Sequence, residues 1–296
     1  MHPGNAGSHR ANKMFDLFIE DTTDFEGQKL CEQFCDFRGQ EGLLPSCSIR
    51  VYKKAFYPDK AVLLDEIGRV GLYRDGEYYY IRYNIPEQDP IIAKCTHDFK
   101  QILVYYQEIK GQYIQSKVAA VIYFGYRNLV ISTGNLMIHS AAIIHREKGI
   151  LFCGISGAGK STQAHLWIQY LDAVMLNADK PCLIRRDRGF FVHGTPWSGK
   201  ERVFINAYVP LRCIIFVNQA SENRIIKLSE AEAFSLLYLN NYIYPFSEKY
   251  EEQYIDVVRN VSCSVPVYKL YCDMSEQAVK VLYEELYGEK YCLKED

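Results

Sequence analysis

The sequence predicts an α/β protein in two parts, a smaller β-rich N-terminal region at residues 14–110 and a larger α/β domain at residues 111–296. Three stretches predict this. VGLYRDGEYYYIRYN, residues 70–84, alternates apolar and polar residues as half-buried strands do. ILFCGISGAGKSTQAHLW, residues 150–167, passes from an apolar strand-like run through a glycine-rich turn into a helical pattern. DMSEQAVKVLYEELYG, residues 273–288, has the periodicity of an amphipathic helix.

In the N-terminal region, residues 1–13 are polar and are expected to form a disordered tail. Residues 24–38 are expected to form a short helix. CSIRVYKK, residues 47–54, and the stretch quoted above predict strands, with Asp75-Gly76 as a hairpin turn. Residues 96–110 fit neither pattern clearly.

The larger domain opens with a buried amphipathic helix over residues 111–133, where apolar residues recur every three or four positions. Two strands in 136–154 with a turn at 146–149 and a helix at 160–171 are expected after it. A strand at 173–186, whose pairing Pro181 limits, and a strand at 211–219 follow. A further helix is expected to begin at Ser229, because Ser229 and Glu232 match a capping box.

Composition narrows the class of protein. Lys and Arg total 34 and Asp and Glu 36, a net charge of −2, which argues against a nucleic-acid enzyme. The 10 cysteines include no C-x-x-C pair, and Cys153, Cys182 and Cys213 lie in apolar runs where a thiol behaves as a small hydrophobe. No signal peptide and no membrane-spanning run are apparent. We therefore expect a cytoplasmic protein with neither nucleic acid nor membrane as partner.

Gly154, Gly159, Lys160 and Ser161 match the phosphate-loop pattern G-x-x-x-x-G-K-[ST]. Glycines allow backbone N–H groups to surround phosphate oxygens, and the N-terminus of the following helix adds partial positive charge. Lys160 is expected to reach the β- and γ-phosphates, and a hydroxyl of the first helical turn to reach Mg²⁺. An incidental lysine in a glycine-rich turn is the alternative, but the flanking strand and helix argue against it. The residues expected to bind nucleotide are Gly154, Ser156, Gly157, Ala158, Gly159, Lys160, Ser161 and Thr162.

Phosphoryl transfer also needs a carboxylate that holds Mg²⁺ or accepts a proton. Asp179 in LNADKP lies 19 residues after Lys160, at the end of the next predicted strand. Asp172 competes with it, but a helix-to-strand turn favours aspartate for local reasons. Asp179 is therefore the expected functional acid, with a structural strand-end role as the alternative.

Four segments in order, IHSAAI, GISGAGKST, LNADKP and HGTPWSGKE, resemble the C-terminal domain of HPr kinase/phosphorylase and the wider phosphoenolpyruvate carboxykinase-like group. The resemblance covers residues 112–290, and small HPr-kinase-like bacterial proteins are the most similar. It implies a P-loop domain with a mixed sheet. Some relatives of this kind phosphorylate serine in a protein, in a peptide or as the free amino acid.

By this resemblance, His139 matches a histidine beside the catalytic acid, where an imidazole orients a carboxylate or shuttles a proton. A strand histidine satisfied by the backbone is the alternative. Asp179 matches one member of a paired Asp-Asp, and Ala178 stands in place of the other. The pair divides the work of base and metal support, so Ala178 makes the reverse phosphorylase reaction more doubtful than the kinase reaction.

The stretch VHGTPWSGKERVF, residues 192–204, occupies the position of the long HPr kinase signature without matching it. The resemblance places this second loop near the phosphates. Lys200 and Arg202 are expected to neutralise charge on the transferring group, and Glu201 to support Mg²⁺ indirectly. Trp197 is either a wall of the acceptor pocket or a packing residue. An ordinary charged surface turn is the alternative for the whole loop.

The expected function is that of an ATP-dependent kinase that uses Mg²⁺ and phosphorylates a hydroxyl, with serine in a protein, peptide or small molecule as the expected acceptor. The catalytic residues are expected to be Asp179, His139, Lys160, Lys200 and Arg202, and the metal-binding residues Ser161, Asp179 and Glu201.

A non-catalytic ATP-binding regulatory module is the alternative, with the N-terminal region as its interaction surface. ATP is taken as the default donor: no guanine signature Asn-Lys-x-Asp is present, and the sequence leaves GTP or another donor open. The resemblance to HPr kinases, which are hexamers, leaves open that this protein forms a homo-oligomer. The chain is too short for the full substrate-binding part of a carboxykinase, so that activity is disfavoured.

Overall fold

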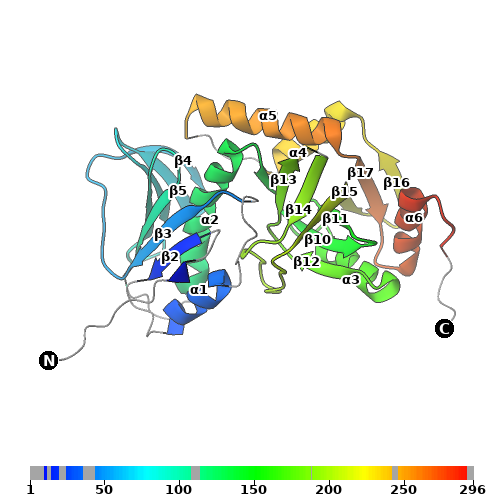
Figure 1. Cartoon of the computed structure of the whole chain (residues 1–296), viewed down its shortest axis with the longest axis horizontal. Helices are drawn as coiled ribbons and strands as arrows, with labels where there is room; N and C mark the ends of the chain where they lie inside the picture. The colour runs from blue at the N-terminus through cyan, green and yellow to red at the C-terminus, as the bar shows by residue number, and fades with distance from the viewer. Residues whose placement is uncertain are drawn as a thin grey trace. The chain divides into compact units, whose positions relative to one another are not determined.

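The computed structural model describes residues 10–11, 15–19, 25–35, 44–107, 114–187, 189–241 and 246–291. The protein is a mixed α/β structure with two mixed sheets, which confirms the predicted class at that level (Figure 1). It divides into two compact units, Met1–Thr133 with Tyr244–Gln253, and Gly134–Ile243 with Tyr254–Asp296.

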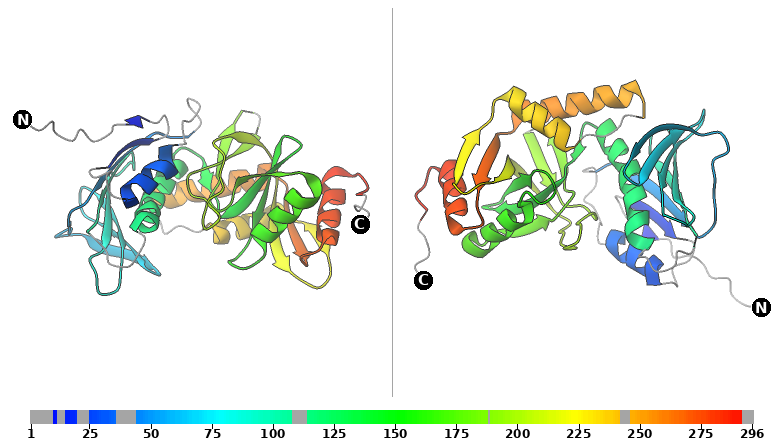
Figure 2. Two further views of the ribbon diagram at one scale, coloured as in Figure 1. Left: turned by 90° about the horizontal axis from the view of Figure 1, so that it is seen from below. Right: turned by 180° about the vertical axis from the view of Figure 1, so that it is seen from behind.

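The first unit contains an eight-stranded sheet, ordered β1-β2-β3-β8-β7-β6-β5-β4, that curls into a half-barrel (Figures 1 and 2). Its strands are β1 (Arg10–Ala11), β2 (Phe15–Ile19), β3 (Cys47–Tyr52), β4 (Val62–Ile67), β5 (Val70–Arg74), β6 (Tyr79–Tyr83), β7 (Ile91–Cys95) and β8 (Gln101–Tyr105). Its helices are α1 (Phe25–Cys35) and α2 (Ile114–Ser132). The β2–β3 and β3–β8 pairs are parallel and the others antiparallel.

The predicted hairpin is confirmed, since β5 and β6 pair from Val70↔Tyr83 to Arg74↔Tyr79. The carboxylate of Asp75 accepts hydrogen bonds from the backbone N–H groups of Glu77 and Tyr78, both at 2.8 Å. An Asp side chain that captures nearby N–H groups in this way is the reason that Asp is favoured at turns.

Two parts of the N-terminal prediction differ from the structure. Arg10–Ala11 forms strand β1 within the segment expected as a tail, and the other residues of 1–13 lie outside the described residues. The α2 helix, which the predicted boundary assigned to the larger domain, clusters with the first unit. The reason is packing, since α2 buries its apolar residues on β6, β7 and β8.

The second unit contains a sheet with the main order β12-β10-β11-β15-β14-β13-β9, to which β17 adds beside β15 and β16 beside β17. Its strands are β9 (Leu136–Met137), β10 (Ser140–His145), β11 (Lys148–Cys153), β12 (Val174–Asn177), β13 (Cys182–Arg186), β14 (Gly189–His193), β15 (Tyr208–Gln219), β16 (Arg224–Lys227) and β17 (Val267–Cys272). Its helices are α3 (Lys160–Leu171), α4 (Glu230–Asn240) and α6 (Glu276–Tyr287), and α5 (Glu248–Ser264) contributes residues to both units.

Helices α3 and α6 bury apolar side chains in one core with β10, β11, β12, β15 and β17. Trp167 of α3 is fully buried there, and Cys153, Cys182 and Cys213 are buried as the apolar runs predict. Burial raises the pKa of each of these three thiols, so all three stay neutral at pH 7. Strand β11 is buried from Gly149 to Cys153, which explains its continuous apolar run.

The strand expected over residues 173–186 is in fact two strands, β12 and β13, which pair with different neighbours. Pro181 between them has no N–H to donate, and the side chain of Asn177 captures two backbone N–H groups that a continuous strand would pair. The turn predicted at 146–149 is confirmed but shorter, with Arg146 and Glu147 at φ 49° and 60° between β10 and β11. The predicted capping box of Ser229 and Glu232 at the start of α4 is confirmed.

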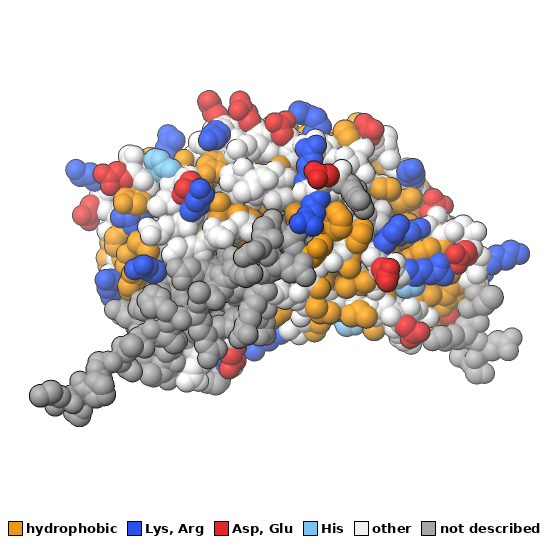
Figure 3. Space-filling model, in the orientation of Figure 1, with side chains coloured by type: hydrophobic (Ala, Val, Ile, Leu, Met, Phe, Trp, Pro, Cys, Tyr) orange, Lys and Arg blue, Asp and Glu red, His pale blue; other side chains and the backbone are white. Residues whose placement is uncertain are grey.

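Charged side chains of both signs are interspersed on the face drawn in Figure 3. In the second unit, the Arg146 guanidinium of the β10–β11 turn donates to both carboxylate oxygens of Glu289, which follows α6, at 3.0 and 2.9 Å. None of the helices that the structure describes is long and apolar enough to cross a membrane.

Candidate functional site

The candidate site lies at one edge of the sheet in the second unit. Strands β11 and β12 both run antiparallel to β10, which lies between them. The end of β11, the start of β10 and the end of β12 therefore meet at the same edge. This brings together the phosphate loop after Cys153, His139 before β10 and Asp179 beyond β12, which are distant in sequence.

The phosphate loop has the predicted context, since it joins β11 to α3. Gly154, Gly157 and Gly159 have φ of 139°, 80° and 99°, backbone conformations that residues with a side chain rarely adopt. A Cβ on Gly154 would also lie 3.0 Å from the backbone oxygen of Val217, so a side chain at this position would be both strained and crowded. Gly159 caps α3 without a side-chain hydrogen bond, which leaves the first N–H groups of the helix for another acceptor.

Lys160 is folded onto this loop. Its Nζ donates to the backbone oxygens of Gly154 at 2.9 Å and Ile155 at 3.0 Å. Burial lowers the pKa of Lys160, and the ammonium of Lys180 lowers it further. A nearby anion would offset both effects, so the position favours binding of negative charge. The side chains of Ser161 and Thr162 are partly exposed in the first turn of α3.

His139, Asp179 and Lys180 form a cluster beside the loop. The Nζ of Lys180 lies 2.6 Å from Nδ1 of His139 and 3.1 Å from Oδ1 of Asp179, while Nε2 of His139 is 3.7 Å from the same Oδ1. Burial lowers the pKa of His139, and the Lys180 ammonium lowers it further against the opposing Asp179 carboxylate. The imidazole is therefore neutral at pH 7 and accepts a hydrogen bond from Lys180.

Asn177 and Thr195 help to hold this cluster in place, although neither is among the predicted site residues. Oδ1 of Asn177 accepts from the backbone N–H groups of Asp179 at 3.0 Å and Lys180 at 2.8 Å, forming a turn. Its Nδ2 donates to the backbone oxygen of Thr195 at 2.8 Å. The only sequence signal was Asn177 itself, a residue type favoured at turns, two positions before Asp179.

The backbone on either side of His139 is fixed from α4. The His139 N–H donates to Oδ1 of Asn241 at 3.0 Å, and Nδ2 of Asn240 donates to the His139 oxygen at 3.3 Å. The backbone N–H of Ser140, the residue after His139, donates to the backbone oxygen of Asp179 at 3.0 Å. Both asparagines are more than 100 residues from His139, so no local pattern could have predicted these contacts.

The second loop reaches Asp179 through Gly199. A Cβ on Gly199, which has φ of 65°, would lie 3.0 Å from Cβ and 3.3 Å from Oδ2 of Asp179. Trp197 is buried, with 6% of its surface exposed, and its backbone oxygen accepts from the Lys180 N–H at 3.1 Å. This burial favours packing as the role of the Trp197 ring.

The charged residues of the second loop are exposed. Oε2 of Glu201 lies 3.1 Å from Nε2 of His165 on α3, which joins the loop to the helix that follows the phosphate loop. Within the described chain, Lys200 and Arg202 make no ion pair, whereas Asp179 is paired with Lys180 and Glu201 with His165. The structure thus brings Asp179, His139 and the phosphate loop together, and it places Lys200 and Arg202 as exposed cations on the adjoining loop.

We expect Gly199→Ala to destabilise the second unit more than Gly288→Ala does. Both glycines have nearly the same φ, 65° and 66°, but an added Cβ meets Asp179 only at Gly199 and open space at Gly288. The shared backbone strain is about 1 kcal/mol, and crowding Asp179 adds roughly 1 kcal/mol or more.

Urea unfolding followed by tryptophan fluorescence would measure this difference. Both tryptophans of the chain, Trp167 and Trp197, lie in the second unit. Equal losses of unfolding free energy in the two variants would show that the loop yields to the added methyl without cost.

No family model and no curated protein sequence matches this chain. Among the described residues there is also no group of three or more His, Cys, Asp or Glu side chains placed to hold a metal ion by themselves.

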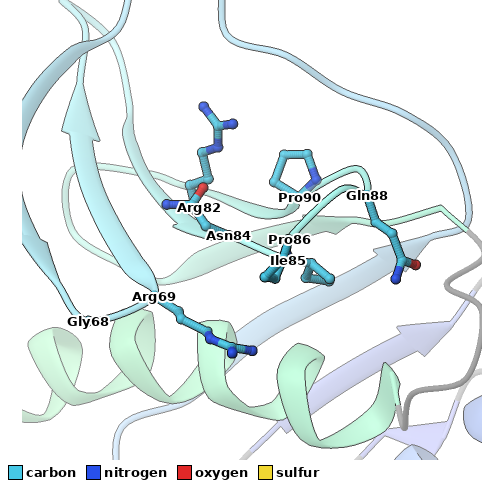
Figure 4. A pocket seen from close by; sticks show the side chains of 8 residues that line it. All are labelled: Gly68, Arg69, Arg82, Asn84, Ile85, Pro86, Gln88 and Pro90. Atoms are coloured by element: carbon cyan, nitrogen blue, oxygen red, sulfur yellow. The ribbon is translucent and has the colours of Figure 1, made fainter.

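A separate hollow of about 310 Å³ lies in the first unit, beside the β4–β5 turn and the end of β6 (Figure 4). Its lining includes Arg69, Arg82 and Asn84. Figure 4 shows the two arginine side chains extending in different directions rather than converging. They do not form a single cradle for one anion, so this hollow is a weaker candidate than the edge of the second sheet.

Proposed function

We propose that this protein is a nucleotide-dependent kinase of the HPr-kinase-like type, which transfers the γ-phosphoryl group of ATP to a hydroxyl, with serine as the acceptor residue. The observation that carries the proposal is the placement of Asp179 and His139 at the same sheet edge as a complete phosphate loop. The proposal includes the fold of that family for the second unit, since the four matching segments meet at this edge.

The residues present fit a nucleoside triphosphate. The loop from Gly154 to Gly159 has the positive φ angles of a backbone cradle, and α3 begins without a side-chain cap. Lys160 at the start of α3 would exchange its bonds to the loop oxygens for bonds to phosphate oxygens.

The same edge offers oxygen ligands for Mg²⁺. The hydroxyl of Ser161 and the carboxylate of Asp179 are the groups that would hold it, and Mg²⁺ usually takes only one or two protein ligands beside phosphates. Its contribution when bound is to neutralise charge on the phosphates. Glu201 is engaged with His165, so its expected support of the metal would be indirect.

Asp179 is the proposed general base, because a carboxylate beside the phosphate loop can accept the proton of the attacking hydroxyl. Ala178 leaves it without an acidic neighbour at the preceding position. The neutral imidazole of His139 lies 3.7 Å from the Asp179 carboxylate and forms one side of its immediate environment. Lys200 and Arg202, both exposed on the second loop, are the proposed cations for charge on the transferring group.

Phosphorus NMR of the protein with Mg²⁺ and ATP, with and without free serine and a pool of serine peptides, would test the proposal. We expect acceptor-dependent ADP and a new phosphoserine-type signal. Unchanged ATP with every acceptor, together with saturable nucleotide binding, would instead favour the regulatory ATP-binding module.

We expect Lys160→Ala to abolish that signal and to weaken ATP binding about 10- to 100-fold, because a charge-assisted hydrogen bond contributes roughly 1.5–3 kcal/mol. Lys148→Ala is the matched control, since Lys148 is an exposed lysine at the opposite end of β11. Isothermal titration calorimetry would measure both affinities, and equal affinity in the two variants would remove Lys160 from the phosphate site.

A further inference from the structure

We propose that Lys180 is the positioning residue of this site, which fixes the side chains of Asp179 and His139 relative to each other. The catalytic consequence of this positioning rests on the proposed kinase function. The positioning itself rests on the contacts that Lys180 makes.

The first support is the bridging geometry. His139 and Asp179 do not hydrogen-bond directly, since their closest approach is 3.7 Å. Lys180 contacts both through one ammonium group, at 2.6 Å to Nδ1 of His139 and 3.1 Å to Oδ1 of Asp179. Removal of the ammonium would therefore disconnect the two side chains.

The second support is that Lys180 is itself held rigidly. Its backbone N–H donates to Oδ1 of Asn177 and to the backbone oxygen of Trp197, at 2.8 and 3.1 Å, and its backbone oxygen accepts from Oγ1 of Thr195 at 2.6 Å. Its side chain is only 17% exposed, against 40% for His139. A half-buried lysine with a fixed backbone loses little further entropy when it orients its neighbours.

The third support is the orientation that results for Asp179. Lys180 occupies Oδ1, while Oδ2 faces Gly199, the small residue of the second loop. One carboxylate oxygen is thus engaged with the protein, and the other faces the loop that carries Lys200 and Arg202. Ala178, the residue before Asp179, has no polar side chain to contact this carboxylate, whereas Lys180, the residue after it, does contact it.

The kinetic test uses Lys180→Ala and Lys180→Arg, with Lys148→Ala as the control lysine. In Lys180→Ala we expect kcat to fall about 100-fold, as for a misplaced catalytic group, while the Kd for ATP changes less than about 2-fold. Lys180→Arg should recover part of kcat. Ethylammonium chloride should restore Lys180→Ala at least about 10-fold, and tetramethylammonium chloride, which has no N–H donor, should not.

Three outcomes would overturn the proposal. These are an unchanged kcat in Lys180→Ala, equal restoration by the two salts, or a loss of ATP affinity as large as the loss of kcat. The last outcome would make Lys180 a direct phosphate ligand.

A crystal structure of Lys180→Ala separates this proposal from the proposed function. We expect the side chains of His139 and Asp179 to change rotamer or separate, even if no acceptor for the wild-type protein is found. Unchanged positions of both side chains would refute the positioning role. Absence of transfer in the wild-type protein would instead count against the kinase function.

Discussion

Asp179→Asn is expected to lower the rate of phosphoryl transfer about 1,000-fold, as for the loss of a general base. The change removes the proton acceptor but keeps an oxygen that can accept from Lys180, so the local geometry is retained. Binding of ATP in EDTA should stay within about 3-fold of wild type, because no metal is then shared with the carboxylate. Single-turnover kinetics with the serine acceptor and calorimetry would measure the two quantities.

Asp172→Asn is the matched control for this substitution. Asp172 is the other carboxylate near the phosphate loop in sequence, and it caps α3 with φ of 52°, a conformation that Asn tolerates well. We expect normal transfer in Asp172→Asn. A similar loss in both variants, or none in Asp179→Asn, would show that Asp179 is not the base and would favour the regulatory module.

Trp167→Ala is expected to destabilise the second unit by about 3–5 kcal/mol, the largest structural effect of a single substitution. Trp167 has no exposed surface, and its ring packs edge-on to His145 at 5.3 Å and near Phe152 at 6.4 Å between ring centroids. Removing the indole leaves a cavity between α3 and the sheet that carries the phosphate loop. Urea unfolding, followed by the remaining Trp197, would give the free energy of unfolding.

Trp167→Phe should cost much less, roughly 1.5 kcal/mol or below, because most of the ring volume is kept. The Nε1 of Trp167 is buried without a hydrogen-bond partner among the described residues, so Phe also removes an unsatisfied donor. An equally large loss in Trp167→Phe would mean that the shape of the indole, rather than the volume it fills, sets the stability of this core.

The mixed α/β class, the strand–loop–helix of residues 148–171 and the C-terminal helix were predictable because each depends on local pattern. Glycines at Gly154, Gly157 and Gly159 specify positive φ, and apolar spacing specifies the buried faces of α3 and α6. The single strand expected over 173–186 was wrong because apolar character cannot show where a side chain such as Asn177 captures the backbone. The unit to which α2 belongs depended on packing against β6–β8, which periodicity does not encode.

By itself, the sequence determined the phosphate-loop motif, its helix and the choice of Asp179 as a candidate residue, since these depend on residue type and spacing along the chain. His139 became a candidate only through the resemblance of the segment IHSAAI to the HPr kinase domain. Only the tertiary structure decided that Lys180 bridges the two, that Asn240 and Asn241 hold the His139 backbone, and that Gly199 lies against Asp179. Those contacts join segments separated by up to 102 residues or depend on side-chain direction at a turn. Sheet pairing fixes such distances, because antiparallel β10 brings the start of one strand beside the ends of two others.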